Sequence, residues 1–221
     1  MAALLGPHAH LARRCGQAAR YLPDVSPFLA LPLDPDEGAW ADLAKLLGPA
    51  GVGSTLGVPA APPPGWEVLL DVEGVQMVED RVAARPDPEA IMLGAADVPE
   101  MLDLVARTRP GPFLARTIEH GSYLGIRRNG ELIAMAGERV RAPGWTEISA
   151  VCTDERFRGE GLGTRLVQAV AAGISGRGET AFLHAAARNT GAIRLYQALG
   201  FRVRRSARFV AVRAPASRAA A

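Results

Sequence analysis

The sequence predicts an α/β fold with a mixed, mostly antiparallel sheet flanked by helices, preceded by an N-terminal accessory α+β region. Asn129-Gly130 separates two alternating segments, 122–127 and 131–140, and this dipeptide is the strongest short hairpin signal. The segments from 146 to 213 then follow the order strand, helix, strand, helix, strand. Hairpin strands followed by this alternation indicate a mixed sheet with helices on its faces.

The first 84 residues are expected to form the accessory region. Apolar spacing predicts helices over 7–21 and 36–47. A Gly- and Pro-rich stretch at 48–65 predicts a loop or linker, and strand-like pieces follow at 66–70 and 74–78. The run Arg85-Pro86-Asp87-Pro88 is poorly compatible with a helix or a central strand, so we place a domain boundary there.

The elements after that boundary are more regular. We expect a strand at 90–93, a helix at 98–107, the two hairpin strands, a strand at 146–153 and a helix at 161–174. A strand at 181–186, a helix at 191–199 and closing strands at 201–205 and 208–213 complete the pattern. The main domain is therefore expected to cover residues 85–214, with a disordered tail at 215–221.

The composition is typical of a soluble globular protein. Hydrophobic residues make up 48% and charged residues 22%, and the net charge of +2 comes without a basic block, which argues against nucleic-acid binding. Cys15 and Cys152 lack CxxC spacing, which fits a reducing compartment, and no group of residues has metal-ligand spacing. The sequence has no apolar run of signal-peptide or membrane-spanning length. We expect a cytoplasmic protein without a metal and without membrane contact.

A glycine-rich loop joins the strand at 146–153 to the next helix. It reads Arg158-Gly159-Glu160-Gly161-Leu162-Gly163-Thr164. The free N–H groups of a first helical turn attract an anion, and glycines let a pyrophosphate approach the backbone closely. No Gly-Lys-Ser/Thr follows, which excludes a Walker A loop; a dinucleotide fingerprint needs a wider spacing between its last two glycines and no preceding hairpin. A glycine-rich turn without a ligand is a further alternative.

The loop resembles the acyl-CoA-binding signature of the GNAT superfamily, Gln/Arg-x-x-Gly-x-Gly/Ala. A second family feature stands at the expected separation, running from Asn189 through Tyr196 to Leu199-Gly200-Phe201. The resemblance covers about 90–213. Within the superfamily, the chain is most similar to the FR47-like branch, which is related to glycine N-acyltransferases. The segment that carries this similarity is Thr146-Glu147-Ile148-Ser149-Ala150-Val151-Cys152-Thr153.

This resemblance implies that acetyl-CoA is the co-substrate. It implies that two central strands splay apart and that the backbone of Val151 and Thr153 pairs with the pantetheine amides. The pyrophosphate would lie against Arg158, Gly159, Glu160, Gly161, Leu162, Gly163 and Thr164. Asn189 and Tyr196 would face the thioester. Sheet edges in this superfamily often pair, so a homodimer is an expected assembly.

The chemistry of acyl transfer adds two candidate catalytic residues. The attacking amine must be neutral although its pKa is roughly 10, so a base has to take its proton. Glu147 is the first candidate for that base, with a solvated strand-edge glutamate as the alternative. Glu138 and His120 are weaker candidates, and His184 is interpreted as a core or cleft histidine. Tyr196 is expected to donate to the departing thiolate, although a core tyrosine on the apolar stripe of its helix is the alternative.

We therefore expect direct transfer of an acetyl or acyl group to an amine of a small molecule or peptide. One alternative is a non-catalytic acyl-CoA-binding sensor, and another is a nicotinamide-binding oxidoreductase. The accessory region is interpreted as a degenerate half of a GNAT unit or as a cap that shapes the acceptor pocket.

Overall fold

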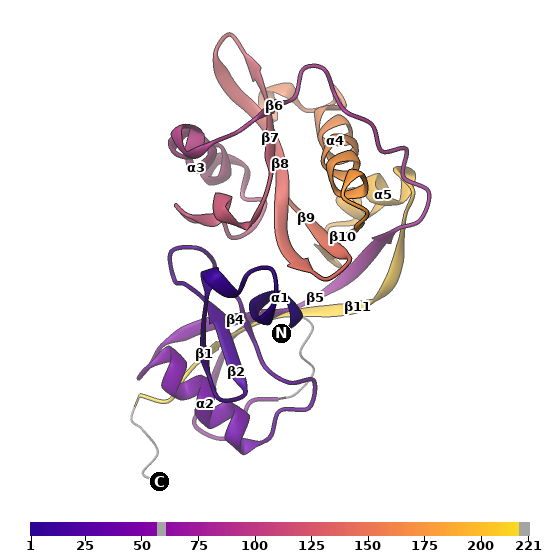
Figure 1. Ribbon diagram of the computed structural model, residues 1–221. Helices are drawn as coiled ribbons and strands as arrows, with labels where there is room; N and C mark the ends of the chain where they lie inside the picture. The colour runs from indigo at the N-terminus through magenta and orange to yellow at the C-terminus, as the bar shows by residue number, and fades with distance from the viewer. Residues whose placement is uncertain (57–60, 217–221) are drawn as a thin grey trace.

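The computed structural model describes residues 1–56 and 61–216 and contains a large mixed sheet (Figure 1). In this part of the chain the sheet has eight strands in the order β4-β11-β5-β10-β9-β8-β7-β6. Their bounds are β4 (Val52–Leu56), β5 (Glu67–Glu79), β6 (Ile91–Met92), β7 (Tyr123–Arg128), β8 (Glu131–Ala142), β9 (Trp145–Thr153), β10 (Thr180–Ala186) and β11 (Phe201–Arg213). All neighbours pair antiparallel except β9 and β10, so the predicted mixed, mostly antiparallel fold class is confirmed.

Helices cover both faces of this sheet. Helix α3 (Val98–Thr108) lies on one face, and α4 (Leu162–Gly176) and α5 (Thr190–Ala198) lie on the other (Figure 1). One apolar core joins α4 to the strands through Leu166, Val170 and Ile174. A second core lies under α3, around Met101 and Leu104. The sheet is therefore the middle of three layers, as the sequence predicts.

The sequence places most elements of the second half correctly. The hairpin of β7 and β8 turns at Asn129 and Gly130, whose φ angles of 51° and 83° are those that favour this dipeptide. The expected closing strands at 201–205 and 208–213 form one strand, β11, with a register shift between Val203 and Arg205. Similarly, the pieces at 66–70 and 74–78 belong to one continuous strand, β5.

The expected helix at 7–21 is wrong. After the short helix α1 (Ala2–Leu5) and a 3-10 turn, this segment forms strands β1 (Ala12–Cys15) and β2 (Ala18–Tyr21), which pair with β3 (Leu29–Ala30) in a second, three-stranded sheet. Gly16 adopts φ 48° at the turn, and the Gln17 N–H donates to Oδ2 of Asp42 at 3.0 Å. Asp42 lies on α2 (Glu37–Leu47), the other helix expected in this region, so a tertiary contact overrides local helix propensity.

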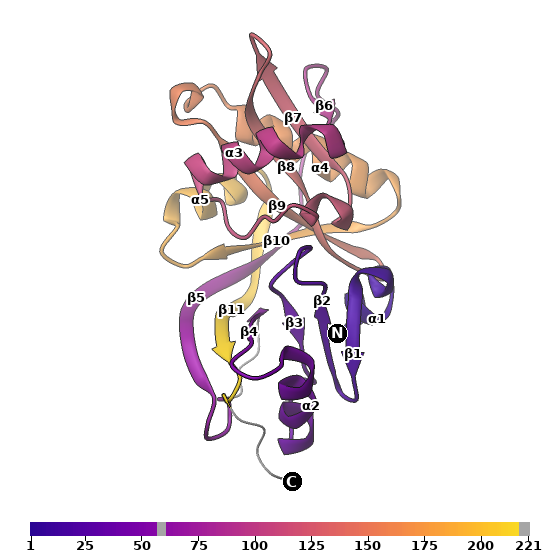
Figure 2. The same ribbon diagram turned by 90° about the vertical axis from the view of Figure 1, so that its left-hand side faces the viewer.

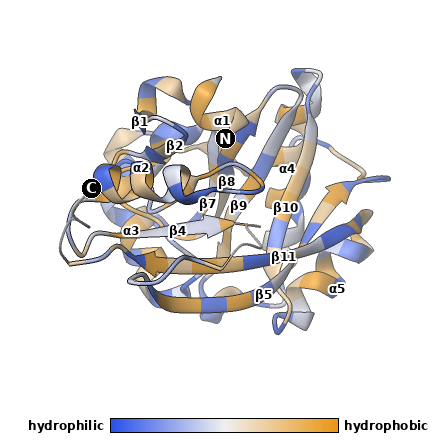
Figure 3. Ribbon diagram, turned by 90° about the horizontal axis from the view of Figure 1, so that it is seen from below, coloured by the Kyte–Doolittle hydropathy of each residue, from blue (hydrophilic) through white to orange (hydrophobic). Residues whose placement is uncertain are grey.

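The first 84 residues also enter the large sheet. β4 forms inside the stretch that the sequence assigns to a linker, and β5 lies between β10 and β11 (Figure 2). The first half of β5 exposes Val68, Leu69 and Leu70, in an apolar stretch of the ribbon (Figure 3). Residues 57–60 of the expected linker and 217–221 of the expected tail lie outside the described residues. No helix in the described part is both long and apolar enough to span a membrane.

Candidate active site

The centre of the sheet opens where two parallel strands stop pairing. β9 and β10 pair from Trp145 with Thr180 to Glu147 with Phe182. Beyond that point β10 continues along β5, and β9 continues along β8. The edge of β9 that faces β10 is therefore without a strand partner from Ile148 onward. Unpaired backbone N–H and C=O groups at such an edge can bind an extended ligand.

A bulge in β9 lies directly after this opening. Ser149 pairs with Gly137 and Cys152 pairs with Met135, so β9 has one residue more than β8 between the two pairs. Ala150 adopts φ 52°, a left-handed conformation that costs a non-glycine residue about 1–3 kcal/mol. Bulges bend a strand and redirect its side chains, and they are frequent next to active sites.

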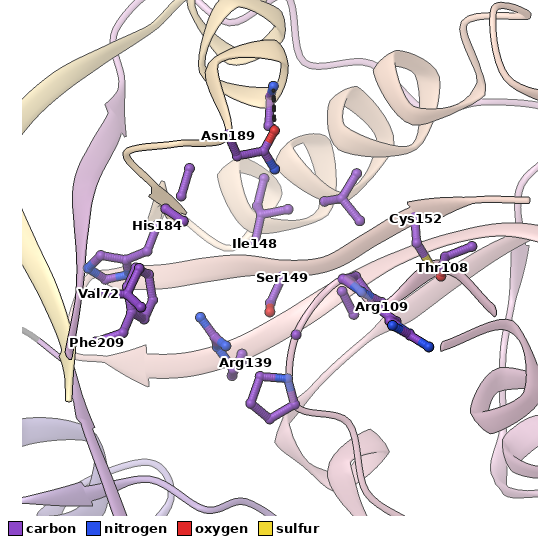
Figure 4. Close-up of a pocket in the computed structure, with 18 of the residues that line it drawn as sticks. Val72, Thr108, Arg109, Arg139, Ile148, Ser149, Cys152, His184, Asn189 and Phe209 are labelled. Atoms are coloured by element: carbon purple, nitrogen blue, oxygen red, sulfur yellow. Dashed lines mark hydrogen bonds between the residues drawn. The ribbon is translucent and has the colours of Figure 1, made fainter. Parts of the chain in front are cut away.

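The opening leads into a cavity of about 810 Å³, within the usual range for small-molecule sites. Five residues expected to bind the donor line it: Val151, Thr153, Arg158, Asn189 and Tyr196. We call this part the donor side. In Figure 4, the labelled side chains run from His184, Val72 and Phe209 at one end, past Ser149 and Arg139, to Cys152, Thr108 and Arg109.

The glycine-rich loop lies beside the cavity rather than on its wall. Gly159 and Gly161 adopt φ 90° and 74°, so glycine suits both positions. A Cβ added at Gly163 would lie 3.9 Å from Thr153 Oγ1, which places the start of α4 next to the donor side. The Leu162 side chain, however, is buried in the core and cannot contact a ligand there. Glu160 and Thr164 belong to the same turn, at 160–164, and contribute none of the cavity wall.

Of the three arginines near this loop, Arg158 is the one that lines the cavity. Arg165 is bonded to Asp87 and Glu89, and Arg156 to Asp154 and Glu131. Their charges are thus largely compensated by carboxylates. Arg158 takes part in none of the salt bridges found among the described residues. It is the arginine best placed to meet a phosphate group.

Helix α5 brings two polar side chains to the donor side. Asn189 caps the helix, because its Oδ1 accepts the Ala192 N–H at 3.1 Å. Tyr196 is 8% exposed and packs in the same core as Phe201, with 6.2 Å between ring centroids. Burial raises the pKa of Tyr196 to about 12, so its hydroxyl stays protonated near neutral pH. Tyr196 is therefore both a core residue and a residue of the cavity wall.

Glu147, the expected base, is fully buried and does not line the cavity. Arg139 binds its carboxylate through two bonds, Nε to Oε2 at 3.0 Å and Nη2 to Oε1 at 2.6 Å. Burial alone would raise the pKa of Glu147, but Arg139 and His184 outweigh burial and hold this pKa far below its usual range. A carboxylate held in this way is a weak base, and it is not a solvated strand-edge residue.

His184 connects this carboxylate to the cavity. Its Nδ1 lies 2.7 Å from Glu147 Oε1, and its Nε2 lies 3.1 Å from Gln76 Nε2. Arg204 donates to Gln76 Oε1 at 3.0 Å, which fixes the orientation of the Gln76 amide. The amide N–H₂ of Gln76 then faces His184 Nε2, and the other ring nitrogen, Nδ1, faces Glu147.

The weaker candidates lie elsewhere. Glu138 is buried and bonded to Arg177 at 2.9 Å. His120 is buried against His8 and Tyr21, and burial together with the nearby His8 lowers its pKa to about 3. Neither residue lines the cavity. His184, Arg139 and Gln76 were not predicted to act in the site, because they come from β10, β8 and β5 and meet only through strand pairing.

The mixed sheet thus opens between its two parallel strands, and the N-terminus of α4 lies at that opening. Residues 123–210 match the family described as FR47-like protein. A protein from Novosphingobium aromaticivorans assigned to the GNAT acetyltransferase family is 42% identical, with a TM-score of 0.87 over 95% of this chain and 94% of that chain. The chain therefore belongs to the GNAT family of acetyltransferases, and its second half is similar to the FR47-like proteins.

A second solved structure has the same fold. A GCN5-related N-acetyltransferase from Kribbella flavida is 18% identical, with a TM-score of 0.64 over 98% of this chain and 95% of that chain. A comparison with curated proteins gives no match. The family membership rules out the nicotinamide-dependent oxidoreductase considered from the sequence.

Proposed function

We propose that the protein transfers an acetyl group from acetyl-CoA to the amine of a small molecule or peptide by direct attack. The observation that carries this proposal is that the unpaired edge of β9, the Tyr196 hydroxyl and the His184 imidazole all reach one cavity. The donor would lie along β9, with its amides on the backbone of Val151 and Thr153. Its pyrophosphate would lie against Arg158 and the turn at Gly159–Thr164. This turn leads into the first residues of α4.

His184 is the group that we assign as proton acceptor. Among the described wall residues it is the one imidazole; the others are arginines, a thiol, a tyrosine and uncharged residues. Glu147 would stabilise the imidazolium that forms and would keep the ring oriented, as a positioning residue. The Gln76 amide would have to release Nε2 as the amine or a bridging water arrives.

The bond changes follow from these positions. The amine nitrogen attacks the thioester carbon, the C–S bond breaks, and the amine proton passes to His184 Nε2. Tyr196 donates a hydrogen bond to the departing thiolate, and it keeps its own proton because its pKa of about 12 exceeds that of a thiol, about 8.5. The thiolate is then protonated by His184 or by water.

Cys152 supports attack on the thioester without a covalent enzyme intermediate. It lines the cavity, but burial raises the pKa of its thiol to about 11. Such a thiol is almost entirely protonated at neutral pH and is a poor nucleophile.

We also assign to residues 1–84 the role of a cap that shapes the acceptor pocket. Phe28, Ser54, Thr55, Leu70 and Val72 come from this region and line the cavity. They lie outside the part that matches the FR47-like family, residues 123–210. Residues 1–84 thus supply part of the cavity wall, beside residues from the part that matches the family.

The first experiment is a calorimetric titration with acetyl-CoA, together with thiol release in the presence of an amine panel. We expect micromolar binding, about −8 kcal/mol, and its loss in Gly161→Glu. Gly161→Ala is the matched control, because it imposes the same strain at φ 74° and its Cβ would contact no other atom. Tight binding without turnover of any amine would instead favour the acyl-CoA sensor.

A further inference from the structure

The cavity has a second part, which we call the acceptor side: Phe28, Val72, Arg139, Ser149, His184 and Phe209. Its members form one connected group. Arg139 and His184 bind the same Glu147 carboxylate, the Arg139 guanidinium lies 4.9 Å from the Phe28 ring centroid, and the rings of His184 and Phe209 are 6.3 Å apart.

The wall of the cavity carries positive charge that no acidic side chain on the wall compensates. None of the described residues that line the cavity is Asp or Glu, whereas Arg109, Arg139, Arg158 and Arg188 all do. The nearest buried carboxylate, Glu147, is already bound by Arg139 and His184. A polycationic acceptor would bring further ammonium groups into a cavity with no carboxylate to receive them, which is unfavourable for each buried charge.

Arg139 is built to hold an anion. Its Nε and Nη2 atoms bind Glu147, which fixes the plane of the guanidinium and leaves Nη1 as the group that can meet a ligand. The residue is 8% exposed, so a bond formed there is shielded from water. A fixed guanidinium binds carboxylates well, and the Ser149 hydroxyl on the same wall can add a second donor.

Apolar side chains complete the acceptor side. Phe28, Val72 and Phe209 offer two rings and a branched aliphatic surface. This wall fits an aliphatic or aromatic body rather than a sugar with many hydroxyl groups.

We propose that the acceptor is an amine that carries a carboxylate and an apolar body, as an apolar amino acid does. The carboxylate binds Arg139, the apolar body lies against Phe28, Val72 and Phe209, and the amine faces His184. This inference rests on the proposed function, because it names the acceptor of that same reaction.

The test compares L-phenylalanine, L-phenylalaninamide and spermidine as acceptors, with thiol release as the readout. The amide keeps the amine and the ring but lacks the carboxylate. We expect kcat/KM for the acid to exceed that for the amide by at least about tenfold, roughly 1.4 kcal/mol. The amide has the less basic amine and is more often neutral at the assay pH, so amine ionisation cannot produce this preference.

Arg139→Lys tests the guanidinium while it keeps a positive charge beside Glu147. We expect the acid-to-amide ratio of kcat/KM to fall about tenfold, through a higher KM for the acid; a general loss of turnover would affect both acceptors alike and would cancel in this ratio. Arg81→Gln is the control, since the Arg81 side chain is 90% exposed and lies outside the cavity. If Arg139→Lys does not fold, the comparison of the three acceptors on the unaltered protein still tests the proposed acceptor class.

Two results would overturn the inference in different ways. Preference for the amide or for spermidine would overturn the acceptor class and leave the acyltransferase proposal standing. Acetyl-CoA binding without turnover of any of the three amines, or of a wider amine panel, would overturn both proposals.

Discussion

The Nδ1 atom of His184 lies 2.7 Å from Oε1 of Glu147, and the same oxygen receives Nη2 of Arg139 at 2.6 Å. The buried Glu147 carboxylate on β9 thus holds the Arg139 guanidinium on β8 and the His184 imidazole on β10, the two strands that flank β9. Its own negative charge is held by two partners, and in the proposed mechanism it acts through His184 rather than through contact with the substrate.

Glu147→Gln is expected to lower both stability and turnover. It leaves Arg139 buried without its counter-charge, which costs about 3–5 kcal/mol, and it removes the partner of the imidazolium, which lowers kcat by about a hundredfold. Glu138→Gln is the control, because Glu138 is also buried and bonded to an arginine, Arg177, but is not bonded to His184. Equal kcat in both variants, measured by thiol release, would refute the assignment of His184 and Glu147.

The Glu147 carboxylate also makes stability depend on pH. Its pKa in the folded protein lies below that in the unfolded chain, about 4.3, so its contribution is complete above that value and is lost as the pH falls further. Urea unfolding between pH 6 and 3 should show a smaller loss in Glu147→Gln than in the unaltered protein.

Tyr196→Phe is expected to lower kcat by about tenfold to a hundredfold while acetyl-CoA binding stays the same. The change removes the donor to the departing thiolate and preserves the packed ring. Tyr123→Phe provides the matched control: the Tyr123 hydroxyl is buried without a hydrogen-bond partner in the described structure, away from the cavity. Removing it should leave kcat unchanged and raise stability by about 1 kcal/mol.

His120→Phe is expected to make the protein less sensitive to mild acid. Burial lowers the pKa values of His8 and His120 to about 4 and about 3, so below about pH 6.5 the unfolded chain binds more protons than the folded one. Each such histidine costs up to about 1.4 kcal/mol of stability per pH unit as the pH falls from 6.5 to 4. Denaturation at pH 7.5 and pH 5 should show a smaller difference in His120→Phe, whereas the exposed His10→Phe should keep it.

A fragment that begins at residue 85 is expected not to fold. It lacks β5, which lies between β10 and β11, so it would expose unpaired edges on two central strands. Far-ultraviolet circular dichroism and gel filtration of residues 85–221 would check this. A monodisperse fragment that unfolds cooperatively would contradict it.

The sequence predicts features that depend on near neighbours. The Asn129-Gly130 turn and the helix expected over 36–47 need only residues close in the chain, and both are present. The helix expected at 7–21 fails because the turn at Gly16 is held by Asp42, a residue distant in the chain. Local propensity cannot report a bond of that kind.

The same holds for the site: features set by near neighbours could be predicted, and features set by distant contacts could not. Its donor side could be named from two short motifs, because their spacing is local to a loop and a helix. The group of Arg139, Glu147 and His184 depends on the register of β8, β9 and β10, and single residues on three strands give no such information. The available signal for His184 is that it is a polar residue inside the apolar stretch 181–186.

The position of β5 between β10 and β11 also sets the order of events during synthesis. β5 leaves the ribosome well before its partner β11. At typical translation rates of 5–20 residues per second, the apolar ribbon at Val68 to Leu70 waits on the order of ten seconds for that partner. The nascent chain therefore carries an unprotected sheet edge during this interval, and a chaperone that shields it should raise the yield of folded protein.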